Sequence, residues 1–190
     1  GLGISTDGGA TFTNRTTADG LGNNQVQEVY ADGATVYAAT DGGLGISTDG
    51  GATFTNRTAA NSGLGSNDVR GVYADGGTVY AATYGGGVGV STDGGNTFTN
   101  RTTADGLGSN FVWGVYADGA TVYAALGGGL GVSTDGGATF TTYTTADGLG
   151  SNQVSGVYAD GGTVYAATLG GGLGVSDSSG GVGGTGGAGG

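Results

Sequence analysis

The chain is 190 residues long and 50 of these are glycine, whereas proline, cysteine, methionine, histidine and lysine are absent. Its 15 acidic residues outnumber four arginines, and the net charge of −11 disfavours nucleic acid and anionic membrane surfaces as partners. No apolar run approaches the roughly 18 residues that a membrane-spanning helix needs. We therefore expect no nucleic-acid partner and no membrane insertion.

A short motif recurs at a nearly fixed spacing along the chain. Ser-Thr-Asp-Gly-Gly-Ala-Thr-Phe occupies residues 5–12, 47–54 and 133–140, and a variant with Asn for Ala occupies residues 91–98. Successive copies begin 42, 44 and 42 residues apart. A period in this range is typical of β-propellers and of longer repeat arrays.

The unit of residues 25–56 illustrates the elements that each repeat predicts. Side chains alternate in period two from Val26 to Tyr30, and β-branched and aromatic residues follow at 35–40, which indicates two strands joined by an Asp-Gly turn. Residues 44–47 and 52–55 predict two further strands, separated by the glycine-rich motif. Four short antiparallel strands in about 43 residues correspond to one propeller blade.

Incomplete repeats stand at both ends of the described pattern. Residues 2–13 predict only the last two strands of a blade, and residues 154–176 only the first three. We expect an all-β propeller of four-stranded antiparallel blades, about four in number, over residues 1–176, closed by pairing strands from both termini. The glycine-rich residues 177–190 predict a tail or linker.

Together the repeats predict four strands each of the first, second and fourth type in a blade, but five of the third type. A four-bladed ring therefore leaves one strand of the third type without a place. A surplus strand favours head-to-tail assembly, in which the last strands of one copy pair with the first strands of the next. A contact of this kind produces a ring or a filament. The alternative is that the chain is a segment of a longer repeat array.

The repeated motif resembles the Asp-box, or bacterial neuraminidase repeat, of sialidases and related propellers. The resemblance implies a structural hairpin in which the aspartate accepts hydrogen bonds from turn amides and the phenylalanine packs between sheets, without a catalytic role. It covers four sets of serine, aspartate, glycine and phenylalanine: Ser5, Asp7, Gly9 and Phe12; Ser47, Asp49, Gly51 and Phe54; Ser91, Asp93, Gly95 and Phe98; and Ser133, Asp135, Gly137 and Phe140.

Residues 148–176 also resemble the two-component regulator propeller repeat. The shared pattern is a Gly-Leu-x-Ser-Asn-x-Val segment, a turn with Asp and Gly, and a later Gly-Leu run. Gly stands here in place of a proline, and Tyr-Ala-Ala in place of Trp-x-Gly. This second resemblance implies a sensor-type propeller.

Groups that could carry out catalysis are scarce. Glu28 is the only glutamate, and Arg15, Arg57 and Arg101 occupy equivalent repeat positions, so they would be spread around a ring. Glycoside hydrolysis needs two carboxylates in unlike environments, which repeated aspartates do not supply. With histidine, cysteine and lysine absent as well, we expect no enzymatic activity.

Asp19, Asp105 and Asp147 each begin an Asp-Gly-x-Gly-x-Asn loop, whose oxygens are the ligand type that calcium prefers. The spacing does not match an EF-hand loop, which favours the alternative of a turn capped by its own side chain. We therefore expect no cofactor, with calcium at these aspartates as the alternative.

Asn14, Asn56 and Asn100 lie in Asn-Arg-Thr sequons, which predict glycosylation if the source modifies asparagine.

Three aromatic residues, Tyr84, Phe111 and Trp113, interrupt the repeat. Phe111 and Trp113 are two residues apart on a predicted strand and therefore share one face. At the mouth of a propeller such a pair could stack on a sugar ring. The alternatives are core packing and a subunit contact.

These observations favour a non-catalytic, secreted or surface-exposed structural and interaction module that self-associates head to tail into a filament. Its expected partners are further copies of itself, other surface proteins or glycans. The alternative function is a ligand-sensing or glycan-binding propeller domain. Both place the chain outside the cell or on its surface.

Overall fold

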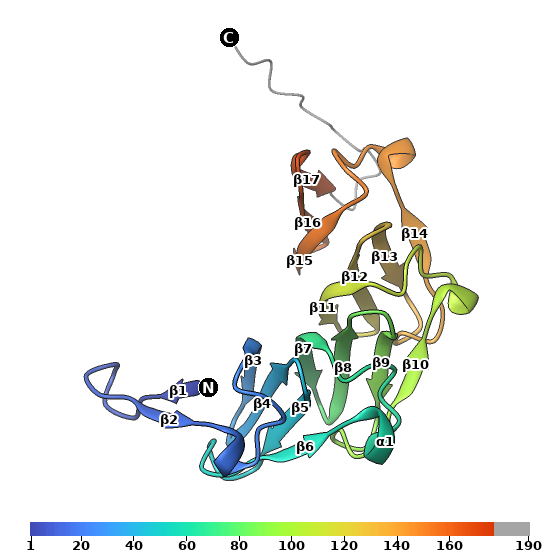
Figure 1. The fold of residues 1–190 in the computed structure, drawn as a ribbon. Coiled ribbons are helices and arrows are strands. Elements are labelled where there is room, and N and C mark those ends of the chain that lie inside the picture. The colour runs from blue at the N-terminus through green and yellow to red at the C-terminus, as the bar shows by residue number, and fades with distance from the viewer. Residues whose placement is uncertain (177–190) are drawn as a thin grey trace.

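The computed structural model describes residues 1–176, which form an all-β arc of successive antiparallel sheets (Figure 1). A two-stranded hairpin comes first, three four-stranded sheets follow, and a three-stranded sheet comes last. The strands are β1 (Leu2–Ile4) and β2 (Thr13–Arg15); β3 (Val26–Asp32), β4 (Thr35–Thr40), β5 (Gly43–Ser47) and β6 (Thr55–Arg57); β7 (Val69–Asp75), β8 (Thr78–Thr83), β9 (Gly87–Ser91) and β10 (Thr99–Arg101); β11 (Val112–Asp118), β12 (Thr121–Leu126), β13 (Gly129–Ser133) and β14 (Thr141–Tyr143); and β15 (Val154–Asp160), β16 (Thr163–Thr168) and β17 (Gly172–Ser176).

Within each sheet the strands lie in sequence order and each pairs with the next, as the repeat predicts for a propeller blade. In the first four-stranded sheet, β3 and β4 are joined through a turn in which Gly33 adopts a φ of +59°, a conformation that favours glycine. The fourth strand of this sheet, β6, begins at Thr55, three residues later than predicted. The reason is a contact with the preceding connector, because the Phe54 N–H donates to the Asp19 carbonyl instead of to β5.

The sheets pack face to face, and small residues make this possible. Ala38, Ala39, Ala81 and Ala82 on the second strands have no exposed surface. One core cluster combines Tyr37, Leu44 and Ile46 of one sheet with residues of the next sheet, among them Val72 and Val79. A larger side chain at an alanine position would push neighbouring sheets apart.

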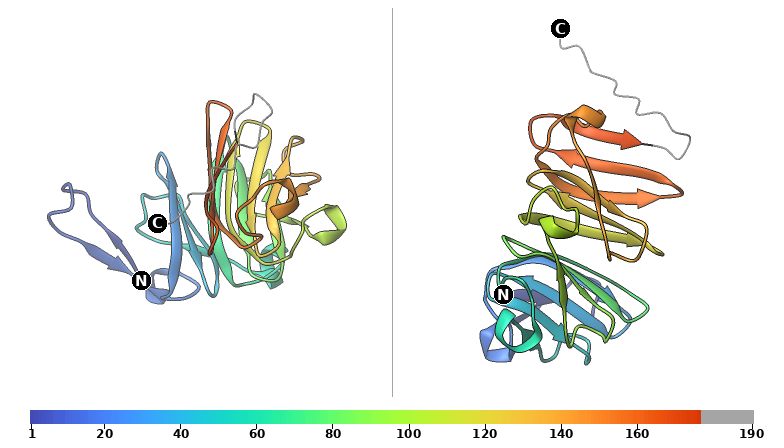
Figure 2. Two further views of the ribbon diagram at one scale, coloured as in Figure 1. Left: turned by 90° about the horizontal axis from the view of Figure 1, so that it is seen from above. Right: turned by 90° about the vertical axis from the view of Figure 1, so that its right-hand side faces the viewer.

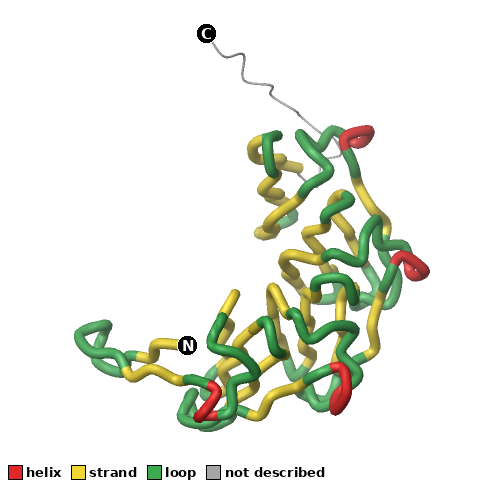
Figure 3. The backbone as a smooth tube through the Cα atoms, viewed as in Figure 1, coloured by secondary structure: helices red, strands yellow, loops and turns green. Residues whose placement is uncertain are grey.

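Short helices occupy the connectors between sheets, where no helix was predicted, and they lie on the outer rim of the arc (Figure 3). They are 3₁₀ turns at Thr17–Asp19, Thr103–Asp105 and Thr145–Asp147, and one α-helical turn, α1, at Ala59–Ser62. Each begins with a threonine that caps it and ends at a glycine with positive φ. Such turns are too short for a helical sequence period to reveal them.

The predicted closure between the two termini is wrong for this structure. The hairpin β1–β2 and the sheet β15–β17 belong to separate sheets and lie at opposite ends of the arc (Figures 1 and 2). The rotation between one sheet and the next is set by their close packing, and over these repeats it stops short of a full turn. The predicted tail at 177–190 lies outside the described residues. In the part of the chain that the structure describes, no helix has the length and apolarity to cross a bilayer.

If the alanine pairs set the spacing of the sheets, Ala81→Leu should lower the free energy of unfolding by about 1–3 kcal/mol, since overpacking strains a filled interior. Urea unfolding followed by circular dichroism measures this difference. Ala104→Leu, on an exposed connector turn, is the matched control and should change it by less than about 0.5 kcal/mol. Equal effects of the two substitutions would contradict the role given to the alanines.

Candidate binding site

Each Asp-box turn is held by the side chains of its serine and aspartate. Ser47 Oγ donates to Asp49 Oδ1 over 2.6 Å and accepts from the Gly51 N–H over 2.8 Å. Asp49 also accepts from the N–H and the hydroxyl of Thr53, at 3.0 and 2.7 Å. The copies around Asp7, Asp93 and Asp135 repeat these bonds. These contacts fit the turn-stabilising role that the resemblance implies.

These hydrogen bonds favour the charged form of each carboxyl and therefore lower its pKa. The bond from the Thr97 N–H, followed by that from Ser91, lowers the pKa of Asp93 to about 2. The pKa values of Asp7, Asp49 and Asp135 are lowered for the same reason. Because the folded pKa lies below the unfolded one, the turns stabilise the fold above about pH 4 and lose this contribution as the pH falls towards 2.

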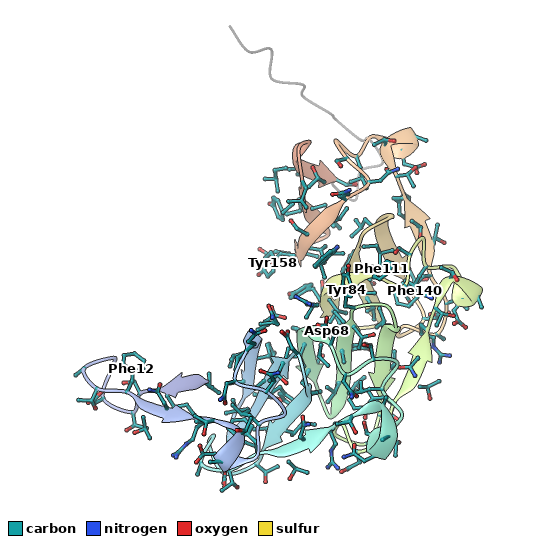
Figure 4. All side chains as sticks on the ribbon, viewed as in Figure 1. Phe12, Asp68, Tyr84, Phe111, Phe140 and Tyr158 are labelled. Carbon is teal, nitrogen blue, oxygen red and sulfur yellow. The ribbon has the colours of Figure 1, made fainter. Side chains whose placement is uncertain are left out.

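The phenylalanine that ends each Asp-box is buried in three of four copies. Phe54, Phe98 and Phe140 are 7–8% exposed, whereas Phe12 is 65% exposed on the first hairpin (Figure 4). The expectation that all four pack between sheets is therefore wrong for Phe12. Within the described residues, no connector leucine packs over the first hairpin as Leu21 packs beside Phe54.

The loop aspartates considered for calcium are used as helix caps. Asp19 Oδ2 accepts from the Thr16 N–H over 2.8 Å and forms a capping box with this residue. Asp105 and Asp147 make the same contacts with Thr102 and Thr144. Each aspartate thus bonds to its own loop, as the alternative to calcium binding predicts. The bonded group lies at the start of a short helical turn and not in a simple turn. Among residues 1–176, no cluster of three acidic side chains could hold a metal ion.

The three sequon asparagines differ in their surroundings. Asn56 Nδ2 donates to the Gly42 carbonyl over 2.9 Å, and Asn100 Nδ2 donates to the Gly63 carbonyl over 2.7 Å. A glycan on either nitrogen would require this bond to break. Asn14 is exposed, so the prediction of glycosylation fits the folded chain best at this site.

Variation among the four longest repeats is concentrated at two positions. The first carries Gln27, Arg70, Trp113 and Ser155, and the second carries Asp41, Tyr84, Gly127 and Leu169. At both positions all four repeats differ, whereas most of the strand residues around them are the same. Each residue at the first position is the extra residue of a β-bulge at the start of its sheet. A bulge redirects a side chain without disturbing the rest of the strand, which suits a position that is free to vary.

The predicted aromatic residues meet at these variable positions. The Tyr84 ring lies 4.7 Å from the Phe111 ring and 5.3 Å from the Trp113 ring, measured between centroids. The loop that carries Tyr84 is one residue longer than that of the preceding repeat, and its Gly85 and Gly87 both donate to the Asn110 carbonyl beside Phe111. All three rings are more than one third exposed, so core packing does not account for them.

Arg70 is a further member of this group that the sequence reasoning missed. Its guanidinium carbon lies 5.3 Å from the centre of the Tyr84 ring and 6.0 Å from that of Trp113. Asp68 orients it through two contacts of 2.6 Å. One signal was present, because Arg70 is the only arginine outside the Asn-Arg-Thr segments. We call Arg70, Tyr84, Phe111 and Trp113 the aromatic cluster.

A hollow of about 240 Å³ adjoins the aromatic cluster. It is lined by residues from four successive repeats, all at the two variable positions: Gln27, Arg70, Trp113, Ser155 and Leu169. Asp68, Tyr84 and Phe111 lie close together near the inner side of the arc (Figure 4). The first strands of the repeats converge on this side, so variable residues from distant parts of the chain share one surface.

No family model and no curated protein matches the sequence. Solved structures match it with propeller-like folds. The extracellular domain of the hybrid two-component system BT3049 from B. thetaiotaomicron has a TM-score of 0.69 at 22% identity, over 84% of this chain and 23% of that one. An ancestral GH74 enzyme has a TM-score of 0.63 at 22% identity, over 83% and 23%. The computationally designed protein Ika4 has a TM-score of 0.61 at 14% identity, over 82% and 93%.

These likenesses show the fold, which is all-β with four-stranded antiparallel sheets arranged as in a propeller. The chain spans only about a quarter of the length of the sensor domain and of the enzyme. The membership in the Asp-box repeat family stays a prediction.

Asp49→Ala should lower the melting temperature more than Asp7→Ala, because Asp49 supports a turn that ends in a buried phenylalanine. The melting temperature of the unmodified chain should also fall between about pH 4 and pH 2, as the lowered carboxyl pKa values require. Thermal melts followed by circular dichroism measure both effects.

Calcium serves as the control in these melts and should leave them unchanged. A rise in melting temperature with calcium that Asp105→Ala abolishes would instead identify the loop aspartates as ligands. Inner Asp-box substitutions without any effect would contradict the turn-stabilising role.

Proposed function

We propose that the chain is a non-catalytic, extracellular recognition propeller whose aromatic cluster binds a glycan. The observation that carries this proposal is the convergence of the two variable repeat positions on one hollow. The packing of the sheets leaves these two positions free to differ, so their side chains are available to meet a ligand. Side chains that bind a ligand must differ, because a single ligand presents different groups to each repeat.

The chemistry of the cluster suits a sugar. Exposed aromatic rings offer flat apolar faces, while the neighbouring side chains offer directed hydrogen bonds. Gln27 Nε2 already donates to Asp41 Oδ1 over 2.6 Å, so the edge of the hollow carries an ordered polar pair. Arg70 adds a guanidinium that Asp68 holds in place. A pyranose ring has apolar C–H faces and hydroxyls around its edge, which match these two types of group.

Two features support a role in binding without catalysis. The carboxylates beside the hollow, Asp41 and Asp68, each bond to a neighbouring side chain, Gln27 and Arg70 respectively. Both are engaged in orienting the binding surface, and a hydrolase needs two carboxyl groups that face the bond to be broken. One structural neighbour is an enzyme, but it shares 22% identity with this chain and therefore supports the fold alone.

The extracellular placement has its support in the sensor domains. The regulator-type resemblance of residues 148–176 suggests this class, and the extracellular domain of BT3049 matches 84% of this chain in fold. The predicted head-to-tail self-association involves the end sheets and not the aromatic cluster, so it is independent of this proposal.

The test is a glycan array with the unmodified chain and Trp113→Ala. We expect binding to one group of related glycans, and a loss of about tenfold or more in affinity for the variant, which corresponds to about 1.4 kcal/mol for one aromatic anchor. Tyr143→Ala, which removes an aromatic ring of similar exposure on another surface, is the matched control and should bind normally.

Circular dichroism melts establish that the variants are folded. Absence of binding across the array would overturn the glycan proposal. Binding that Trp113→Ala leaves unchanged would show that the ligand occupies another surface.

A further inference from the structure

The two end sheets expose residues that inner repeats bury. On the last sheet, Leu173 is 63% exposed, whereas its equivalents Leu44 and Leu130 are 0% and 6% exposed. Tyr165 and Val175 on the same sheet are also exposed, although their equivalents Tyr37 and Ile46 are buried. The outer face of β16 and β17 is therefore one half of an inter-sheet contact.

The first sheets carry the matching half. Phe12 on the first hairpin is exposed, and Val29 of β3 is 43% exposed, whereas its equivalents Val72 and Val115 are buried. In the inner repeats, these positions are covered by the sheet that precedes them. The face that would cover Val29 has the composition of the outer face of the last sheet, because the repeats are nearly identical.

A recurring side-chain arrangement is divided between the two ends. A Cβ built on Gly45 of β5 would lie 3.0 Å from Leu21 of the connector and 3.3 Å from Phe54 of the Asp-box, so the three residues pack tightly. Gly89 and Gly131 have the same two neighbours, a leucine and a phenylalanine. We call this arrangement the Leu-Gly-Phe triad.

At the ends each triad is incomplete. Gly174 of β17 has Leu149 as its neighbour but no phenylalanine, and Gly3 of β1 has Phe12 but no leucine. A cavity of about 520 Å³, lined in part by Leu149, Leu173 and Gly174, lies where the missing phenylalanine would pack. The exposed Phe12 is the side chain that is missing there.

We propose that a second copy of this chain docks on the last sheet and supplies β2 as its fourth strand. In each copy, β2 is paired with β1 over three positions: Leu2 with Arg15, Gly3 with Asn14, and Ile4 with Thr13. The docked β2 exchanges β1 for β17 of the neighbouring copy. Leu173, Gly174 and Val175 then replace Leu2, Gly3 and Ile4, and Phe12 enters the cavity.

The exchange is nearly neutral in strand pairing, because Leu-Gly-Val replaces Leu-Gly-Ile in the same register. β17 is held by five paired positions with β16 and stays in its own sheet. What the exchange adds is burial, since Phe12 completes a Leu-Gly-Phe triad with Leu149 and Gly174. Exchange of an identical element between copies is a low-cost route to association.

The remaining contacts of the docked copy follow those of the inner repeats. Gly51 lies against Ile4 in the single chain, and Val175 would take the place of Ile4 there. Tyr30, Tyr73, Tyr116 and Tyr158 form a row along the inner strands with neighbouring ring centroids 4.9 Å apart. Tyr158 ends this row and is 53% exposed, and it would meet Tyr30 of the second copy.

This contact joins two different faces, so every open assembly retains one free face of each kind at its two ends. Two single substitutions test it from opposite sides: Phe12→Ala weakens the N-terminal face, and Leu173→Asp weakens the C-terminal face. Both residues are more than 60% exposed, so each variant should fold. Mass measurement by light scattering after gel filtration should show assembly of the unmodified chain and monomers for each variant alone.

Mixing the two variants is the decisive step. Each retains one intact face of opposite type, so the mixture should form 1:1 dimers and nothing larger. Ala104→Asp, which adds the same charge on the outer rim, should assemble like the unmodified chain. A monomeric unmodified chain at all concentrations, full assembly by Phe12→Ala, or a mixture that stays monomeric would each overturn the proposal.

Cross-linking tests the register directly, because the chain has no cysteine of its own. Ile46 of β5 pairs with Thr55 of β6, and the equivalent pair between copies is Val175 with Thr13. A mixture of Val175→Cys and Thr13→Cys should form a disulfide-linked heterodimer on oxidation. Val175→Cys mixed with Thr11→Cys should not, and equal cross-linking of both mixtures would refute the proposed register.

Discussion

The close contact between one sheet and the next determines the structure of this chain. Pairs of alanines without exposed surface allow the sheets to approach. On the third strand of each four-stranded sheet, a glycine leaves room for a leucine and a phenylalanine. Each core cluster therefore draws residues from successive repeats. An isolated repeat would bury little, so the fold gains stability through neighbours, as in other repeat proteins.

The same contact explains both ends of the molecule. A repeated interface has two unlike halves, and a chain that does not close presents one half at each end. Phe12 and Leu173 are exposed for this reason, because the equivalent buried positions carry the same residue types, Phe54 and Leu44. Burial of apolar surface favours covering these faces, as it favours the stacking of the inner sheets.

The repeats differ from one another mainly at positions that the packing of the sheets does not constrain. The bulge at the start of each first strand and the following loop between the second and third strands are free to vary, and they meet on the inner side of the arc. Tyr84 comes from one repeat and Phe111 and Trp113 from the next, and the three rings form one surface there. A scaffold of nearly identical repeats can thus present a surface without internal symmetry.

Period, turn chemistry and strand pattern were sufficient to predict the blades, because each depends on residues close together in the chain. The strand Thr35–Thr40 and the contacts of Asp49 are examples. The open arc, the exposure of Phe12 and the position of Arg70 against Tyr84 could not be predicted in this way. They depend on the rotation between packed sheets and on contacts between repeats, which the tertiary structure alone decides.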